Sequence, residues 1–110
     1  MGEIRLIARE EVKEKLDQGH KFILAMTLDE YAFLCKHIPG SICLHNKEDA
    51  VRLFEPHDEI VVYCSNEVCS ASIMAFHYLV DKGFKDVRRY AGGLQDWEEA
   101  GFPLEGDLVN

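Results

Sequence analysis

The residue best suited to chemistry in this chain is Cys64, which directly follows the apolar run Ile60–Tyr63. A β-branched apolar run predicts a buried strand, and the helical pattern beyond it predicts a strand-to-helix connection here. The first backbone N–H groups of a helix lack internal partners and carry partial positive charge, so a loop around that end favours an anion. We therefore expect a Cys64 thiolate with a pKa lowered from about 8.5 to between about 3.5 and 7.5. The loop that would hold it consists of Ser65, Asn66, Glu67, Val68, Cys69 and Ser70.

Position alone leaves alternatives open for the residues that could react. Cys64 could equally be a small buried hydrophobic residue that closes the strand, as free cysteines often are. Cys69 could be a resolving thiol toward Cys64, or its sulfur could fill space beneath the loop. We favour the second role, because the facing sides of a tight loop need not bring two Cβ atoms into disulfide geometry. His37 precedes a Pro-Gly turn with no acidic partner nearby, and we expect it to hold that turn.

The elements that must position Cys64 alternate between strand and helix periods along the chain. Predicted strands cover residues 4–7, 22–26, 42–44, 60–63 and 87–90, and helices are predicted at about 9–18, 29–34, 46–53 and 70–82, with a last helix through Leu94 and Trp97. Five alternations with short connections predict an α/β fold in three layers, a five-stranded parallel sheet with helices on both faces. Ligands of such sheets bind beyond the carboxyl ends of the strands, where Cys64 and the Gly92-Gly93 turn would meet.

Length and composition fit a single domain over residues 1–110. The chain has 110 residues, 47% of them hydrophobic, which is enough for one buried core and leaves no room for a second domain. No run approaches the roughly 20 apolar residues of a membrane span, and the N-terminal residues lack a signal-peptide layout. We therefore expect a cytoplasmic protein that works as a monomer and has no membrane partner.

The charge and the cysteine pattern exclude further classes of function. A net charge of −8 without a basic cluster disfavours a nucleic-acid partner, because phosphates are neutralised by grouped Lys and Arg. Four cysteines without a secretion signal indicate reduced thiols, and we expect Cys35 and Cys43 to lie in the core. The Cys-x4-Cys spacing of Cys64 and Cys69 has no second ligand pair, so we expect no metal site.

Four groups of residues occur in a characteristic order and spacing. They are His37-Ile38-Pro39-Gly40-Ser41-Ile42, then Val61-Val62-Tyr63-Cys64, then Gly83-Phe84 with Val87, then Gly92-Gly93 with Trp97, Ala100, Gly101 and Pro103. With these motifs the chain resembles the rhodanese-like domain family from its first strand to Pro103. The resemblance implies a five-stranded parallel sheet between helices, with the cysteine after the fourth strand as the active residue.

Carried to this chain, that active residue is Cys64. The resemblance implies that Cys64 accepts sulfane sulfur from a donor such as thiosulfate and holds it as a persulfide cradled by loop N–H groups. The sulfur then passes to an acceptor thiol or to cyanide, and no metal or organic cofactor takes part. A thiolate in a nest of N–H groups, inferred above from the residues, agrees with this chemistry.

The loop departs from the family pattern at two places. A common active loop of the family is Cys-x-x-Gly-x-Arg or Thr, whereas this chain has Glu67 in the glycine place and Cys69 in the Arg or Thr place. A carboxylate near the cradle would repel an anionic donor and raise the pKa of the thiolate. We therefore expect a persulfide on a small molecule or a partner protein, rather than thiosulfate, as the donor.

Three hypotheses follow from the sequence. The first is a sulfurtransferase or sulfur carrier that uses a Cys64 persulfide. The alternatives are a non-catalytic rhodanese-like binding or regulatory module, and a thiol redox protein that uses Cys64 and Cys69 together. Cysteine phosphatases also place a thiolate at a helix N-terminus, but they need an arginine six residues after the cysteine, where this chain has Ser70.

Overall fold

The computed structural model describes residues 3–109. Its helices are α1 (Arg9–Asp17), α2 (Glu30–Cys35), α3 (Ala50–Leu53), α4 (Ala71–Asp81) and α5 (Gly93–Glu99), with a 3₁₀ turn η1 (Lys47–Asp49) before α3. Its strands are β1 (Ile23–Met26), β2 (Ile42–Cys43), β3 (Glu59–Tyr63) and β4 (Asp86–Arg89). None of the helices in residues 3–109 has the length and the apolar character that a membrane-spanning helix requires.

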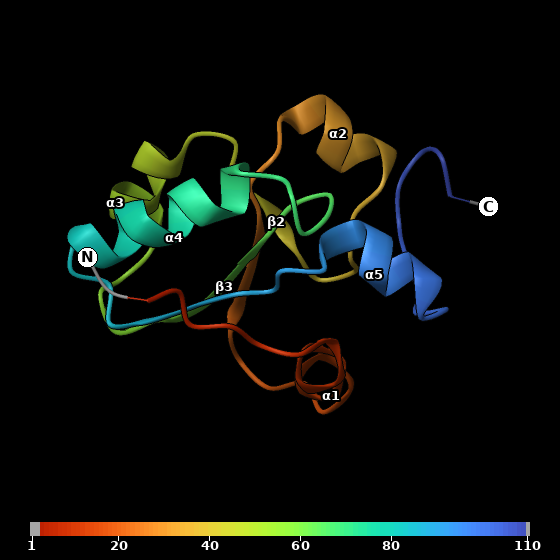
Figure 1. The fold of residues 1–110 in the computed structure, drawn as a ribbon, viewed down its shortest axis with the longest axis horizontal. Helices are drawn as coiled ribbons and strands as arrows, with labels where there is room; N and C mark the ends of the chain where they lie inside the picture. Colours follow the sequence, from red (N-terminus) through yellow and green to blue (C-terminus); the bar gives the residue numbers. More distant parts are fainter. Residues whose placement is uncertain (1–2, 110) are drawn as a thin grey trace.

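The strands form one parallel sheet in the order β2-β1-β3-β4. In this order β3 is central, because it pairs with β1 on one side and with β4 on the other. Since all the strands run in one direction, their carboxyl ends meet at a single edge of the sheet. Figure 1 shows α2 and the first turns of α4 and α5 gathered at this edge.

The prediction of five strands is wrong, because the sheet has four. The segment expected to be the first strand, residues 4–7, makes only one isolated bridge, between Leu6 and Arg89. The N–H of Arg89 donates to Arg5 and the N–H of Ile7 donates to Arg89, and the chain then turns into α1 at Arg9. Leu6 is 61% exposed, so one face of this segment is left uncovered. Because this segment is partly uncovered and makes only two backbone hydrogen bonds to Arg89, it does not extend into a regular fifth strand.

Helices cover both faces of the sheet, as predicted. On one face, α3 and α4 enclose a core that includes Ala50, Phe76, Leu79, Val62 and Val87. On the other face, α1 and α5 enclose a second core that includes Val12, Trp97, Leu24, Val61 and Tyr63. Successive side chains of β3 point to opposite faces and every one from Ile60 to Tyr63 is buried, which explains its unbroken apolar run. Figure 1 shows α3 and α4 together on one side and α1 on the other.

The last residue of β3, Tyr63, fixes this strand to the turn before β2. Its hydroxyl accepts a hydrogen bond from the N–H of Ile38 at 3.0 Å and contacts the Ser41 hydroxyl at 2.8 Å. His37 stacks on Phe33, bonds to the carbonyl of Phe33 and lies 3.4 Å from a carboxylate oxygen of Glu105. His37 therefore holds the turn, as expected, with an acidic partner that its sequence neighbours did not reveal.

Other local predictions have mixed outcomes. Asp29 caps α2 by accepting a hydrogen bond from the N–H of Ala32, whereas Asn46 makes no side-chain cap before η1. Cys35 and Cys43 are only half-buried, so their predicted place in the core is wrong. Cys43 belongs to a two-residue strand at the edge of the sheet, where one side has no neighbouring strand to cover it.

Candidate active site

Cys64 lies directly beyond the carboxyl end of β3, at the centre of the sheet edge. It is 1% exposed. Its carbonyl accepts a hydrogen bond from the N–H of Leu94, and the carbonyl of Ser65 accepts one from Gln95. These bonds attach the start of α5 to the cysteine, as expected for two connections that meet at this edge.

The Gly92-Gly93 turn shapes this side of the site, as the sequence suggested. Gly93 has a φ of +61°, in the left-handed region that favours glycine. A Cβ at this position would also collide with the carbonyl of Cys64. Backbone conformation and close approach therefore both require glycine here.

The six predicted loop residues surround the cysteine unevenly. Ser65, Asn66 and Cys69 are half-buried, whereas Glu67, Val68 and Ser70 are exposed. The loop is held by its own turn, because the side chain of Asn66 accepts from the N–H of Val68 and its carbonyl accepts from the N–H of Cys69. Ser70 precedes α4 and makes no side-chain cap. The structure thus brings the Cys69 carbonyl to the Cys64 sulfur, places Ser65 as a hydrogen-bond partner of the Cys69 thiol, and leaves Val68 exposed in the loop.

The Cys64 sulfur faces the start of α4. Its Sγ lies 3.2 Å from the hydroxyl oxygen of Ser72 and 3.6 Å from the carbonyl oxygen of Cys69. Burial raises the pKa of Cys64, and hydrogen bonds from the hydroxyl and the N–H of Ser72 offset that effect only in part. The prediction of a lowered pKa is therefore wrong for the resting Cys64 thiol, because the cost of burial outweighs the donors around it.

The lowered pKa belongs instead to Cys69. Partial burial by itself would raise the pKa of Cys69, but hydrogen bonds from the Cys64 thiol and from the N–H groups of Ala71 and Ser65 outweigh it. The N–H groups of Ala71 and Ser65 therefore favour the Cys69 thiolate, whereas Cys64 has the N–H of Ser72. The carbonyl oxygen of Cys69 lies 3.6 Å from Cys64 Sγ, so the two cysteines are neighbours, and a resolving role for the Cys69 sulfur stays a prediction.

One residue of the site, Arg89, was missed by sequence reasoning. It is the last residue of β4, is 5% exposed, and donates through Nε to the Ser72 hydroxyl at 2.8 Å. A second nitrogen donates to the carbonyls of Glu67 and Cys69, at 2.9 and 3.3 Å. The signal that could have found it is the period-two pattern of the strand, which puts Arg89 on the same face as the buried Val87.

Glu67 is an exposed residue of the loop. Its side chain lines a pocket of about 200 Å³ together with Asn66, Gly92, Gln95, Asp96 and Glu99, and Cys64 is not part of this lining. The carboxylates of Glu67 and Glu99 make this pocket acidic, whereas that of Asp96 is paired with Arg9 at 2.9 Å. An anion that approaches the loop from the α5 side therefore meets negative charge first.

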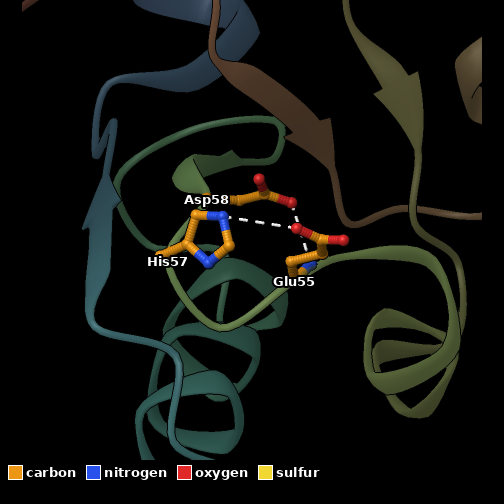
Figure 2. A group of neighbouring side chains, drawn as sticks. All are labelled: Glu55, His57 and Asp58. Carbon is orange, nitrogen blue, oxygen red and sulfur yellow. Dashed lines mark hydrogen bonds and ion pairs between the residues drawn. The ribbon is translucent and has the colours of Figure 1, made fainter.

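A second cluster of titratable side chains lies at the opposite end of β3. Figure 2 shows Glu55, His57 and Asp58, whose potential ligand atoms lie within 4.8 Å of one another. The Glu55 carboxylate lies 3.3 Å from Nε2 of His57, and a carboxylate oxygen of Asp58 accepts from the N–H of Glu55. The side chains of Glu55 and His57 are exposed, and the Asp58 bond is that of an ordinary turn. These contacts explain the cluster without a metal ion.

Comparison with known proteins places this architecture in one family. The sequence profile of the rhodanese-like domain matches residues 8–100. The chain is 34% identical over 107 residues to the thiosulfate sulfurtransferase GlpE of Pseudomonas syringae pv. syringae, a match that covers 96% of each chain. It is also 34% identical over 80 residues to the GlpE of Pseudoalteromonas translucida, covering 71% of this chain and 74% of that one. This protein therefore belongs to the rhodanese-like domain family.

Solved structures show the same fold. A rhodanese-like domain of an Anabaena protein superposes with a TM-score of 0.83 at 25% identity, covering 96% of this chain and 82% of that one. A Bacillus halodurans protein superposes with the same TM-score of 0.83 at 22% identity, covering 96% and 84%. The names of the GlpE relatives support a sulfurtransferase function for this chain in general terms.

Proposed function

We propose that this protein is a sulfurtransferase that carries sulfane sulfur as a persulfide on Cys64. The observation that supports this most strongly is the position of Cys64, at the end of the central strand with its sulfur against the Ser72 hydroxyl and the loop. Ser65 to Ser70 would form the binding loop. Cys64, the loop, Ser72 and Arg89 all belong to one chain, which supports action as a monomer.

The chemistry needs only sulfur exchange. The Cys64 thiolate attacks the outer sulfur of the donor, the sulfur–sulfur bond of the donor breaks, and sulfite or a thiolate leaves with the bonding electron pair. The outer sulfur of the resulting persulfide is then attacked by a thiolate or by cyanide, and Cys64 leaves as a thiolate again. Donors on the loop and on Ser72 would stabilise the negative charge on the terminal sulfur.

We propose that the donor is a persulfide on a small molecule or a protein. In thiosulfate the transferable sulfur is bonded directly to an anionic sulfonate group, and the carboxylates of Glu67 and Glu99 beside the loop would repel that anion. The GlpE relatives are named for thiosulfate, so the two donors must be compared directly.

The test is the rate of thiocyanate formation from cyanide with thiosulfate or glutathione persulfide as donor. We expect wild-type protein to exceed the uncatalysed rate with both donors and to favour glutathione persulfide. Cys64→Ser should lose this excess, whereas Cys35→Ser, which removes a half-buried cysteine of α2, should keep it. Wild type no faster than Cys64→Ser with either donor would overturn the proposal and favour a non-catalytic binding module.

A second candidate, a thiol redox protein, is favoured by the contact between Cys64 and Cys69. The Cys69 thiolate could attack the inner sulfur of a Cys64 persulfide, forming a disulfide between the two cysteines and expelling hydrosulfide. A dithiol reductant would then restore both thiols. Intact mass separates the outcomes, since a persulfide adds about 32 Da and a disulfide removes about 2 Da from the reduced protein. A loss of about 2 Da that requires both cysteines would support this candidate.

A further inference from the structure

Arg89 is a buried cation without an acidic partner. Its side chain is 5% exposed, and no carboxylate among residues 3–109 forms an ion pair with it. The neighbouring Arg88, on the other face of β4, pairs with Glu11 at 2.9 Å and with Glu59 at 3.2 Å. A buried charge is costly unless another charge or several hydrogen bonds compensate it. The surroundings of Arg89 therefore have to explain why a cation lies there.

Two successive hydrogen bonds connect Arg89 to the Cys64 sulfur through the Ser72 hydroxyl. Nε of Arg89 donates to the Ser72 oxygen at 2.8 Å, and the Ser72 oxygen lies 3.2 Å from Cys64 Sγ. Arginine has donors only, so Ser72 is the acceptor in the first bond. A deprotonated sulfur has no hydrogen to give, so Ser72 must be the donor in the second bond once Cys64 loses its proton. The hydroxyl then transmits the polarity of the guanidinium to the sulfur.

The same guanidinium also holds the loop. Its second nitrogen donates to the carbonyl oxygens of Glu67 and Cys69. Those two bonds turn the carbonyls toward Arg89, while the Cys69 carbonyl remains 3.6 Å from Cys64 Sγ. Turning loop carbonyls toward a cation reduces the repulsion that their negative ends would exert on an anionic sulfur.

We propose that Arg89 is a positioning residue that stabilises the anionic form of the Cys64 sulfur through the Ser72 hydroxyl and fixes the loop through its carbonyls. The anion on Cys64, as thiolate or persulfide, is the counter-charge that the buried guanidinium otherwise lacks. This inference deepens the proposed function and rests on Cys64 as the reacting sulfur. It also explains how a loop with no arginine of its own obtains a cation, because Arg89 is supplied by β4, the strand paired with β3.

The charged and titratable groups around the Cys64 thiol are few. From the loop it faces the Cys69 thiol, and from β4 it receives the effect of Arg89 through Ser72 of α4. On the α5 side, the backbone of Gly93 and Leu94 contacts the Cys64 carbonyl and carries no net charge. The phenol of Tyr63 bonds away from the sulfur, to Ile38 and Ser41. Replacing Cys69 by serine therefore leaves Arg89 as the charged group whose effect on Cys64 can be measured.

The test is the pH dependence of Cys64 alkylation by iodoacetamide in a Cys69→Ser background, followed by peptide mass spectrometry. Arg89→Met removes the charge at similar length, Ser72→Ala removes the hydroxyl, and Arg88→Met is the matched control on the same strand. We expect Arg89→Met and Ser72→Ala each to move the midpoint up by about one pH unit, lowering the rate at neutral pH about tenfold. Arg88→Met should leave the midpoint unchanged, and Arg89→Lys should retain part of the effect.

Because the two groups act in series, the double variant Arg89→Met/Ser72→Ala should show little more than the larger single effect. Unchanged midpoints in folded Arg89→Met and Ser72→Ala would overturn the inference. If Arg89→Met fails to fold by circular dichroism, Arg89→Lys decides, and a midpoint in Arg89→Lys equal to that of the Cys69→Ser parent would overturn the inference. Alkylation needs no sulfur donor, so a shifted midpoint together with absent sulfur transfer would refute the proposed function and leave the role of Arg89 standing.

Discussion

The two ends of the central strand β3 each carry a cluster of side chains that could react or bind a ligand, and they differ in their surroundings. At the carboxyl end, Cys64 and Arg89 are buried and are joined through Ser72. At the amino end, Glu55 and His57 are exposed and contact each other at the surface (Figure 2). Reactive residue types lie close together in both places. Only the carboxyl end places them where water is excluded and charge interactions are strong.

The charges at the two ends are also compensated differently. Near the amino end, the Glu59 carboxylate has Lys15, His20 and Arg88 around it, so opposite charges meet at short range. Beneath the Cys64 loop, the charge of Arg89 meets carbonyls and a hydroxyl instead of a carboxylate. A balanced cluster stabilises the fold, whereas an unbalanced buried cation favours the formation of an anion beside it. The comparison therefore predicts where chemistry occurs and where it does not.

The largest expected effect separates the two ends by activity. Cys64→Ser should lower the rate of sulfur transfer at least about a thousandfold, because the nucleophile itself is lost. His57→Ala, at the amino end, should leave the rate within about twofold of wild type. Steady-state rates of both variants with one donor measure this difference. A His57→Ala protein as impaired as Cys64→Ser would remove the distinction between the two ends.

A second expected effect concerns the stability of the carboxyl end. Burial raises the pKa of Tyr63 to about 12, so its phenol is neutral at neutral pH. The phenol oxygen accepts a hydrogen bond from the N–H of Ile38. Tyr63→Phe should lower the free energy of unfolding by about 2 kcal/mol, since that buried N–H loses its acceptor. Tyr31→Phe, on an exposed side chain of α2, should change it by less than about 0.5 kcal/mol. Urea unfolding of both variants and of wild type measures these changes. A Tyr63→Phe variant as stable as wild type would show that the hydrogen bonds of the Tyr63 hydroxyl to Ile38 and Ser41 do not stabilise the fold.

A third effect, in the rate of alkylation, sharpens the difference between the two cysteines. The pKa of Cys69 lies below the ordinary value of a cysteine thiol, because hydrogen bonds outweigh its partial burial, and burial holds the pKa of Cys64 above that value. Because the thiolate is the nucleophile, iodoacetamide at pH 7.5 should label Cys69 faster than Cys64. The ratio of the two labelling rates should narrow as the pH rises and Cys64 ionises. Faster labelling of Cys64 at pH 7.5 would mean that the loop donors favour Cys64 instead.

The smallest expected effect lies at the amino end. Glu55→Ala and His57→Ala should each change the free energy of unfolding by less than about 0.5 kcal/mol, because exposed ion pairs contribute little. Neither change should alter the response of the melting temperature to Zn²⁺, which we expect to be absent. Zinc-dependent stabilisation that disappears in His57→Ala would show that this cluster is a metal site after all.

The fold was predictable from the sequence wherever periodicity is strong. The unbroken apolar run of β3 and the long pattern of α4 gave both elements to within a residue or two, and their alternation gave the parallel sheet. The segment around Leu6 carries a strand-like pattern too, yet it makes a single bridge. The difference depends on which neighbours cover an edge segment, and neighbours in space are not visible in local periodicity.

The site was only partly predictable. Cys64 and its loop follow from a strand that ends at a cysteine before a helix, because that connection is local in the sequence. Arg89 lies 25 residues after Cys64 in the sequence and reaches it only because β4 pairs with β3. The sequence also could not predict that Cys69 has the lower pKa of the two cysteines. That difference depends on how deeply each sulfur is buried and on which hydrogen-bond donors face each sulfur.

The central claim is that Cys64 carries the sulfane sulfur. The most direct measurement is the intact mass of wild type, Cys64→Ser and Cys69→Ser after exposure to glutathione persulfide and removal of excess donor. We predict a gain of about 32 Da, the mass of one sulfur atom, in wild type and Cys69→Ser and no gain in Cys64→Ser. A gain that persists in Cys64→Ser and disappears in Cys69→Ser would assign the sulfur to Cys69 and contradict the claim.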